Sequence, residues 1–396
     1  MKTRTGRFFL LLVILGTLWA PGVVCGQPLF PPSVNLPIPT GPREPEGDGI
    51  FFAAEFLFMR QTNPIEDQPL AFRGLLDADG TITGVPGTFV GSNNVALDAN
   101  QVGGPISWQP GIALAAGWRF SDGTLLEVSW KHLSDTRYSA TASIIPENFA
   151  VRPDLADTFL TSPVFNFPLE FAGAPQNSAL GQPGATFGIW NASSLQTVNF
   201  IQRFDQGAVN FRVPIDKTEN WRMYGIIGGR AVIMFERFSW RVVSADINGL
   251  SNDSTIATYT NVVSQRMYGA NFGVQGDWFW GSGPLGAFAC SCELQGALTM
   301  NVVKERAKYL RDDRAIGANR AVNEYTFAPL VELDVSLWWY PYQGIQCRLG
   351  WDMMAIFNTV AAREPVDFNY GAITPEWDAG QFRFFRGFHV GFGVIF

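Results

Sequence analysis

The sequence predicts an all-β fold, an antiparallel transmembrane up-and-down β-barrel of about 10–12 strands with short periplasmic turns and long extracellular loops. Three observations predict this class. Hydrophobic residues make up 47% of the 396 residues and charged residues 16%, whereas about 25% charged is typical of soluble domains. After the N-terminal segment no run of about 18 apolar residues occurs, which excludes membrane-spanning helices. Apolar and polar residues instead alternate over long segments, and the chain ends on an aromatic residue.

Residues 1–26 have the composition of a cleaved signal peptide. Basic residues precede an apolar run at residues 8–19, and small residues lead to a cleavage site after Gly26. A membrane anchor is disfavoured because the run is too short to span a bilayer. A lipoprotein interpretation at Cys25 is an alternative, but the three residues before it fit poorly. Export predicts a location in the cell outer membrane.

Residues 27–49 form a proline-rich segment. Because proline fixes an extended backbone and removes a hydrogen-bond donor, a polyproline-like periplasmic linker is expected. Docking to an envelope partner is the alternative for this linker. Residues 50–396 are predicted to form the transmembrane β-barrel.

Strands are predicted from side chains that alternate with period two, because successive residues of a strand point to opposite faces. The clearest case is Leu330–Tyr340, where Val331 and Leu333 share one face and Glu332 and Asp334 share the other. Comparable segments, of which 196–213 is expected to be bulged, are found at residues 50–60, 112–120, 126–131, 196–213, 222–236, 268–280, 285–302, 345–353 and 387–396.

Three features favour a membrane barrel over a soluble sandwich, which also alternates. Most segments have about 11 residues or more, against about 5–6 in soluble proteins. Aromatic residues such as Trp118, Trp278 and Tyr340 lie near segment ends, as in an interfacial girdle. Connections alternate in length along the chain: short turns are predicted at 121–123, 214–220, 281–284 and 341–343, and long loops at 61–108, 134–195, 237–265, 304–324 and 357–384. The tally gives ten strands with both termini periplasmic, or twelve if a further pair lies near residues 138–145.

The C-terminus is the most specific signal. Phe388, Val390, Phe392, Val394 and Phe396 alternate with small residues and His389, and the chain stops on the last of them. Outer-membrane proteins characteristically end this way, because the assembly machinery recognises the last strand. Phe392, Val394 and Phe396 are therefore the predicted assembly signal.

Several strings resemble one known family. They are Trp118-Arg119-Phe120 before Asp122-Gly123, Ile189-Trp190-Asn191, Tyr259-Thr260-Asn261, Arg266-Met267-Tyr268-Gly269, Val303-Lys304-Glu305-Arg306-Ala307, Trp338-Trp339-Tyr340-Pro341-Tyr342, Phe357-Asn358-Thr359 and Phe368-Asn369-Tyr370-Gly371. In order and spacing the sequence resembles the planctomycete-type β-barrel porin family designated number seven, over roughly residues 50–396. The resemblance implies an outer-membrane barrel and supplies no catalytic residues.

Charged residues within the strands are the main candidates for function. A lipid-facing Arg or Lys at mid-depth costs about 2–4 kcal/mol, so these groups are expected to face the lumen. The predicted lumen-lining residues are Glu55, Arg119, Glu127, Lys131, Arg230, Glu236, Asp277, Glu293, Glu332, Asp334, Arg348, Asp352 and His389.

Two functions follow from a charged inner face. The preferred one is a porin-like, mildly cation-preferring channel through which small hydrophilic solutes diffuse. The alternative is a closed lumen crossed by salt bridges, in a structural or surface-interaction (adhesin-like) barrel without transport. Strand number does not decide between them, because ten or twelve falls between filled barrels of about eight strands and open porins of about sixteen.

No catalytic, metal or cofactor site is predicted. His132 and Asp135 lie at the expected outer end of a strand and could form an acid–base pair, but no nucleophile motif accompanies them. Cys290, Cys292 and Cys347 lack metal-ligand spacing and are interpreted as small apolar, lipid-facing residues.

The segment 304–314 mixes basic and acidic residues and is predicted to be a solvated external loop, with binding of polysaccharide or lipid phosphate as an alternative. The predicted partners are outer-membrane lipid, the barrel assembly machinery and, as a hypothesis, small solutes. The net charge of −7 disfavours nucleic acid. The sequence makes no prediction of oligomeric state.

Overall fold

The computed structural model describes residues 49–395, with the exception of 78–79, 81–82, 104–107, 121, 145–158, 167–188, 192, 219, 246–249, 284–285, 315–316 and 343–344. The predicted signal peptide, nearly all of the predicted linker and Phe396 lie outside the described residues. Among the described residues, no helix is long and apolar enough to cross a membrane.

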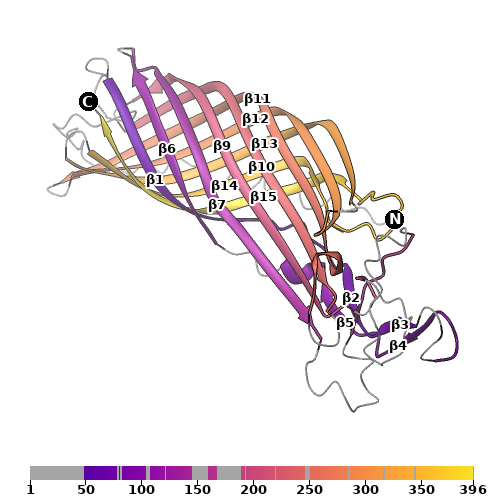
Figure 1. Cartoon of the computed structure of the whole chain (residues 1–396). Coiled ribbons are helices and arrows are strands. Elements are labelled where there is room, and N and C mark those ends of the chain that lie inside the picture. Colours follow the sequence, from indigo (N-terminus) through magenta and orange to yellow (C-terminus); the bar gives the residue numbers. More distant parts are fainter. Residues whose placement is uncertain are drawn as a thin grey trace, which may run out of the picture.

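The core of the molecule is a closed antiparallel β-barrel of ten strands, which confirms the predicted fold class (Figure 1). Each strand pairs with its neighbours along the chain, and the first strand closes the barrel by pairing with the last. In order around the barrel the strands are β1 (Gly49–Gln61), β15 (Asp378–Ile395), β14 (Ile345–Ala361), β13 (Gly317–Tyr342), β12 (Gly286–Arg311), β11 (Ile256–Gly283), β10 (Trp221–Val243), β9 (Leu195–Lys217), β7 (Leu125–Ser143) and β6 (Gln109–Arg119).

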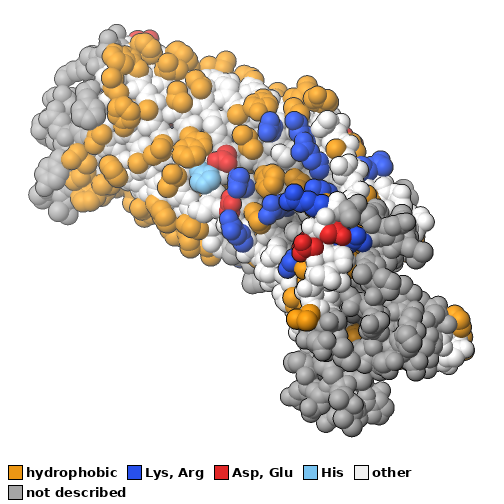
Figure 2. All heavy atoms as spheres, viewed as in Figure 1, with side chains coloured by type: hydrophobic (Ala, Val, Ile, Leu, Met, Phe, Trp, Pro, Cys, Tyr) orange, Lys and Arg blue, Asp and Glu red, His pale blue; other side chains and the backbone are white. Residues whose placement is uncertain are grey.

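The alternating pattern explains why these residues form a membrane barrel. In β11, Tyr268, Phe272 and Trp278 are exposed on the outer wall, whereas Asn271 and Gln275 are buried inside. Hydrophobic side chains cover the outer wall over one broad zone, in which they can contact hydrocarbon (Figure 2). This zone, which we call the apolar belt, defines the membrane-spanning part of the barrel.

The strands are much longer than the sequence predicts on the long-loop side. β11 has 28 residues and β12 and β13 have 26 each, whereas a membrane needs about 9–11 residues per strand. The predicted long loops 237–265, 304–324 and 357–384 are therefore too long, because residues at both ends of each range belong to the adjoining strands. The prediction that 304–314 is a loop was wrong for the same reason, since β12 continues to Arg311. Outside the membrane the outer face is polar, so the alternation that marks a lipid-facing strand disappears.

Residues 138–143 likewise continue β7 instead of starting an extra hairpin, so the barrel has ten strands and not twelve.

The long connections at the same end fold into a cap that packs on the barrel. Two small sheets belong to it, one of β2 (Pro69–Arg73), β5 (Val95–Asp98) and β8 (Leu160–Thr161) and one of β3 (Leu75–Asp77) and β4 (Thr88–Val90). Among the described residues this end also contains two short 3-10 helices, η1 (Ala99–Val102) and η4 (Asp253–Thr255). That this end, which carries the long connections, is extracellular stays a prediction.

Candidate functional site in the barrel lumen

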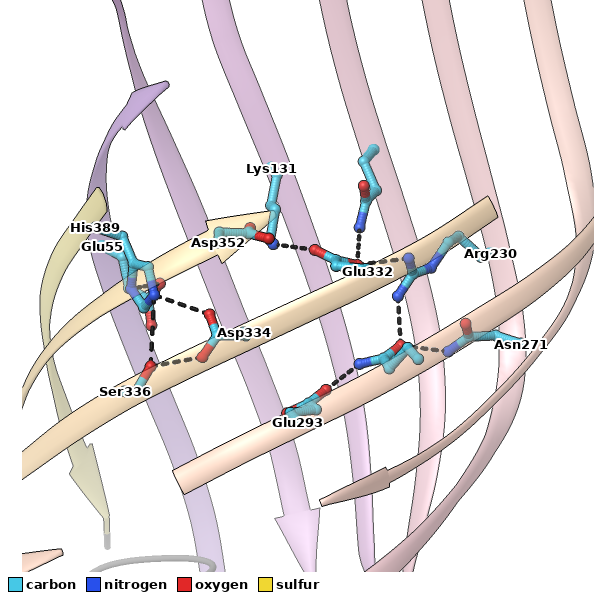
Figure 3. Close-up of polar contacts among 12 residues, drawn as sticks. Glu55, Lys131, Arg230, Asn271, Glu293, Glu332, Asp334, Ser336, Asp352 and His389 are labelled. Carbon is cyan, nitrogen blue, oxygen red and sulfur yellow. Dashed lines mark hydrogen bonds and ion pairs between the residues drawn. The ribbon is translucent and has the colours of Figure 1, made fainter. Parts of the chain in front are cut away.

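The inner face of the barrel carries a set of ion pairs near mid-height, which we call the salt-bridge layer. Its centre is Lys131, whose Nζ lies 2.5 Å from Glu332 Oε1 and 2.5 Å from Asp352 Oδ2 (Figure 3). The other oxygen of Glu332 lies 2.5 Å from Arg230 Nη1. β7 and β13 are five places apart in the order of ten strands, so Lys131 and Glu332 connect opposite walls of the lumen.

A second group of this layer surrounds His389. Its Nδ1 lies 3.1 Å from Glu55 Oε2 and its Nε2 lies 2.8 Å from Asp334 Oδ2. Arg348 also binds both acids, at 2.6 Å to Glu55 and 2.7 Å to Asp334. Ser336 donates a hydrogen bond of 2.6 Å to Asp334. Arg348 and His389 thus share the same two carboxylates, which fixes their positions on β14 and β15.

The third group is organised by Arg212 of β9. Its guanidinium lies 3.1 Å from Glu127 and 2.9 Å from Glu293, and it also donates to Gln275. The layer therefore contains six carboxylates, four Lys or Arg side chains and one histidine, and is net negative with His389 neutral. A cavity of about 130 Å³ lies among these residues. That volume holds only a few water molecules.

An apolar layer crosses the lumen directly beyond the salt-bridge layer on the cap side. We call it the apolar septum, and each of the ten strands contributes to it. Its members are buried and form one contiguous cluster: Leu57, Met59, Ala113, Leu133, Phe204, Val232, Met234, Met267, Ala297, Ala328, Leu330, Met354, Ile356 and Phe385. The rings of Phe204 and Phe385 meet with their centroids 4.6 Å apart. A dry layer of this kind gives a dissolved ion no polar partner.

Beyond the septum a second polar level follows. Arg383 Nη2 lies 2.7 Å from Glu236 Oε2, and Gln202 donates to the other oxygen of Glu236 at 2.9 Å. β15 and β10 are also five places apart around the barrel, so this pair is a second bridge between opposite walls. Ion pairs thus connect the two walls on both sides of the septum.

The cap closes the lumen above this level with an aromatic cluster. Trp190 packs against Trp240, Tyr309 and Tyr370, with ring centroids 5.1–5.6 Å apart, and the ring of Tyr259 stacks on Tyr370. Burial raises the pKa of Tyr370 well above its usual value. The phenol therefore remains protonated, which suits its place in an apolar cluster.

Hydrogen bonds fix the cap to the barrel strands and to itself. Asn261 of β11 donates to the carbonyl of Pro365 at 2.8 Å, and Gln68 both donates to and accepts from the backbone of Val366. These contacts pack the described residues around Gln68 and Val366 against the barrel.

The structure brings ten of the thirteen predicted lumen residues together in the salt-bridge layer. Glu236 lies apart from them, beyond the septum. Arg119 and Asp277 lie toward the short-turn end, where Asp277 accepts a hydrogen bond of 2.9 Å from Gln275. Sequence reasoning missed the cations Arg212 and Arg383, although the parity of their strands places both on the inner face.

The structure gives His132 and Asp135 different partners on the outer wall. His132 Nδ1 lies 2.7 Å from Asp205 Oδ1, and Asp135 accepts two hydrogen bonds from Arg203, at 2.8 and 2.9 Å. The Arg203 guanidinium holds the pKa of the Asp135 carboxyl below its usual range. The two residues therefore do not form a mutual acid–base pair, and an aspartate held by arginine is a poor base.

Within the described residues no group of three or more His, Cys, Asp and Glu side chains is arranged to hold a metal ion. Cys290, Cys292 and Cys347 are free thiols, on the strand faces that carry lipid-facing residues.

Comparisons with known proteins add little to this geometry. No family model matches the sequence, and no curated protein matches it, so the resemblance to the planctomycete-type porin family remains a prediction. The outer membrane protease OmpT from Escherichia coli is 9% identical with a TM-score of 0.38, over 88% of this chain and 97% of that chain. A FadL homologue from Pseudomonas aeruginosa is 8% identical with a TM-score of 0.20, over 88% and 90%. An anion-selective porin from Comamonas acidovorans is 9% identical with a TM-score of 0.14, over 88% and 99%. Similarities this weak support no inference about activity.

Proposed function

We propose that this protein is an outer-membrane β-barrel that is closed to passive diffusion and acts as a structural or surface-interaction protein through its extracellular cap. One observation carries the proposal, the apolar septum to which all ten strands contribute. A hydrated ion that crosses it would lose its water without gaining a polar partner, and unpaired burial of a charge is among the most unfavourable events in a protein.

The surroundings of the septum support the same function. Lys131 on one side and Arg383 on the other bind carboxylates on the opposite wall, so the lumen is bridged twice. The aromatic cluster and hydrogen bonds of the cap add a third obstruction. The described part of the cap also exposes polar side chains such as Ser92, Asn93 and Asn94, which suit contact with partners outside the cell.

The second candidate is the porin-like channel for small hydrophilic solutes. It is favoured by the cavity of about 130 Å³ in the salt-bridge layer and by the net negative charge there. A cation-preferring pathway would use such a lining. In that case the septum and the cap must move apart during transport.

Conductance separates the two candidates. Purified protein in a planar bilayer with 1 M KCl is expected to give no stable current steps. The double variant Phe204→Ala, Phe385→Ala removes the two touching rings of the septum and is expected to give measurable steps or a leak. Stable steps from the unaltered protein would overturn the closed-barrel proposal and favour the channel.

A matched control uses the same two strands. Phe211→Ala, Phe388→Ala removes two phenyl rings that face lipid, with exposed fractions of 42% and 39%. This variant is expected to behave as the unaltered protein does. If the control leaked as much as the septum variant, the leak would come from a loosened barrel and the septum would not be the barrier.

A further inference from the structure

A cluster of basic side chains lies on the outer wall, just beyond the apolar belt on the cap side. Figure 2 shows Lys and Arg side chains gathered there next to hydrophobic ones. Five of them, which we call the basic patch, come from three adjacent strands: Arg237 of β10, Arg266 of β11, and Lys304, Arg306 and Lys308 of β12. All five lie at strand positions whose side chains point away from the lumen.

The strand register brings these cations close together. Arg237 pairs with Val262, and Val262 pairs with Arg306, so the two arginines are two strands apart at one level. With neighbouring strands about 4.8 Å apart, their Cα atoms are separated by roughly 10 Å. Lys304, Arg306 and Lys308 alternate along one strand at intervals of about 7 Å. Like charges at these distances repel one another unless an anion lies among them.

No acidic side chain that the structure describes does so. Among the described residues, none of the five has an ion-pair or hydrogen-bond partner, and the outward side chains between them on β11 are Thr258, Thr260, Val262 and Ser264. Two other outer-wall cations have partners in the protein: Arg203 pairs with Asp135 and Arg241 with Asp312. A chain with a net charge of −7 thus leaves five unpaired outer-wall cations close together at the membrane surface.

We propose that the basic patch binds the phosphate group of an anionic membrane lipid in the outer leaflet. The apolar belt identifies the occupant, because exposed Ile233, Tyr268 and Met300 lie on the same three strands directly below the patch. A lipid whose acyl chains contact these residues has its phosphate at the level of the cations. Arginine and lysine are the side chains that bind phosphate, and cations at a membrane surface favour anionic lipids.

The test compares lipid retention by native mass spectrometry. In mixed micelles with equal amounts of phosphatidylglycerol and phosphatidylcholine, the protein is expected to retain at least about fivefold more phosphatidylglycerol than phosphatidylcholine. This is the preference expected when one cation contributes about 1 kcal/mol to binding of an anionic lipid. The variant Lys304→Gln, Arg306→Gln, Lys308→Gln is expected to lose most of this preference. The control Arg241→Gln, Arg311→Gln, Arg320→Gln has the same charge change, but its residues have partners in the protein, and it should keep the preference.

Each result has one meaning. Equal loss in both triple variants would show a general charge effect and overturn the site, and so would full retention by the patch variant. If millimolar inorganic phosphate displaced the lipid completely, the patch would be a free-anion site and the lipid proposal would be wrong. Each variant is shown to be folded by its migration on a denaturing gel, where the unheated sample should run at the position of the folded barrel. The outcome is independent of conductance, so this proposal and the closed-barrel proposal can fail separately.

Discussion

Replacement of Lys131 by methionine tests whether the salt-bridge layer stabilises the barrel. Methionine keeps the length of the side chain but removes the charge that Glu332 and Asp352 share. Each ion pair at 2.5 Å has an attraction of about 7 kcal/mol at an effective dielectric constant of about 20. Most of this attraction offsets the loss of hydration of the three groups, so the net cost of removing one partner is about 3–5 kcal/mol. Because the Lys131 side chain is 23% exposed, the expected loss in the free energy of unfolding is about 3 kcal/mol, at the lower end of this range.

A double-mutant cycle separates the ion pair from simple packing. In Lys131→Met, Asp352→Asn the carboxylate that Lys131 alone neutralises is gone, while Glu332 keeps Arg230 at 2.5 Å. The double variant is therefore expected to be about 1–2 kcal/mol less stable than the unaltered protein, and thus more stable than Lys131→Met alone.

The assay is urea unfolding in phosphatidylcholine vesicles, which contain no anionic lipid for the basic patch to bind, followed by tryptophan fluorescence. Lys308→Met on the outer wall is the matched control, with an expected change within about 0.5 kcal/mol. If the effects of Lys131→Met and Asp352→Asn measured singly simply added up in the double variant, Lys131 and Asp352 would not interact, and the ion pair between them would be refuted.

Two further predictions concern parts outside the membrane. Burial raises the pKa of Glu305 to about 7, so the folded state is penalised by its charge. This penalty on the free energy of unfolding is absent below about pH 4.5, grows as the pH rises, and is complete above pH 7. Glu305→Gln removes the charge, so it should stabilise the protein by about 2 kcal/mol at pH 8 and change its stability little at pH 4.5. An equal effect at both values would show that charge is not the cause. The second prediction concerns orientation. An epitope inserted between Gly84 and Gly87 in the exposed β3–β4 turn should bind antibody on intact cells, whereas one inserted at Asp122 should bind only after permeabilisation, and the reverse pattern would invert the barrel.

The strands could be predicted because the membrane imposes a strict rule on the sequence. Wherever a strand faces hydrocarbon, every second residue is apolar, and all ten strands were found from this period. The same parity placed Glu332 and Asp334 on the inner face, where they are buried. The rule ends with the apolar belt, so the outer halves of β11 and β12, where Thr260 and Lys308 face water, carried no such signal.

The septum escaped prediction for a related reason. At its level both faces of a strand are apolar, so the alternation disappears into continuous runs such as residues 56–59, 231–235 and 353–357. Such a run inside an alternating strand is itself a signal, since it indicates an apolar layer inside the barrel. The cap had no comparable signal. Its contacts join residues as distant as Gln68 and Val366, 298 positions apart, and no period in the sequence records them.

The septum and the ion pairs respond differently to water, and this difference decides which of them keeps the barrel closed. If water entered the lumen, it would solvate Lys131 and its carboxylates, and this hydration would compensate for much of the attraction that is lost when they separate. Water offers no such compensation to the eleven large apolar side chains of the septum. Full exposure of each costs about 1.5–3 kcal/mol, so wetting one third of their surface costs about 7 kcal/mol in total. At that cost fewer than about one molecule in ten thousand is open at equilibrium. Removal of ion pairs should consequently reduce stability without producing current, whereas truncation of Phe204 and Phe385 should produce current.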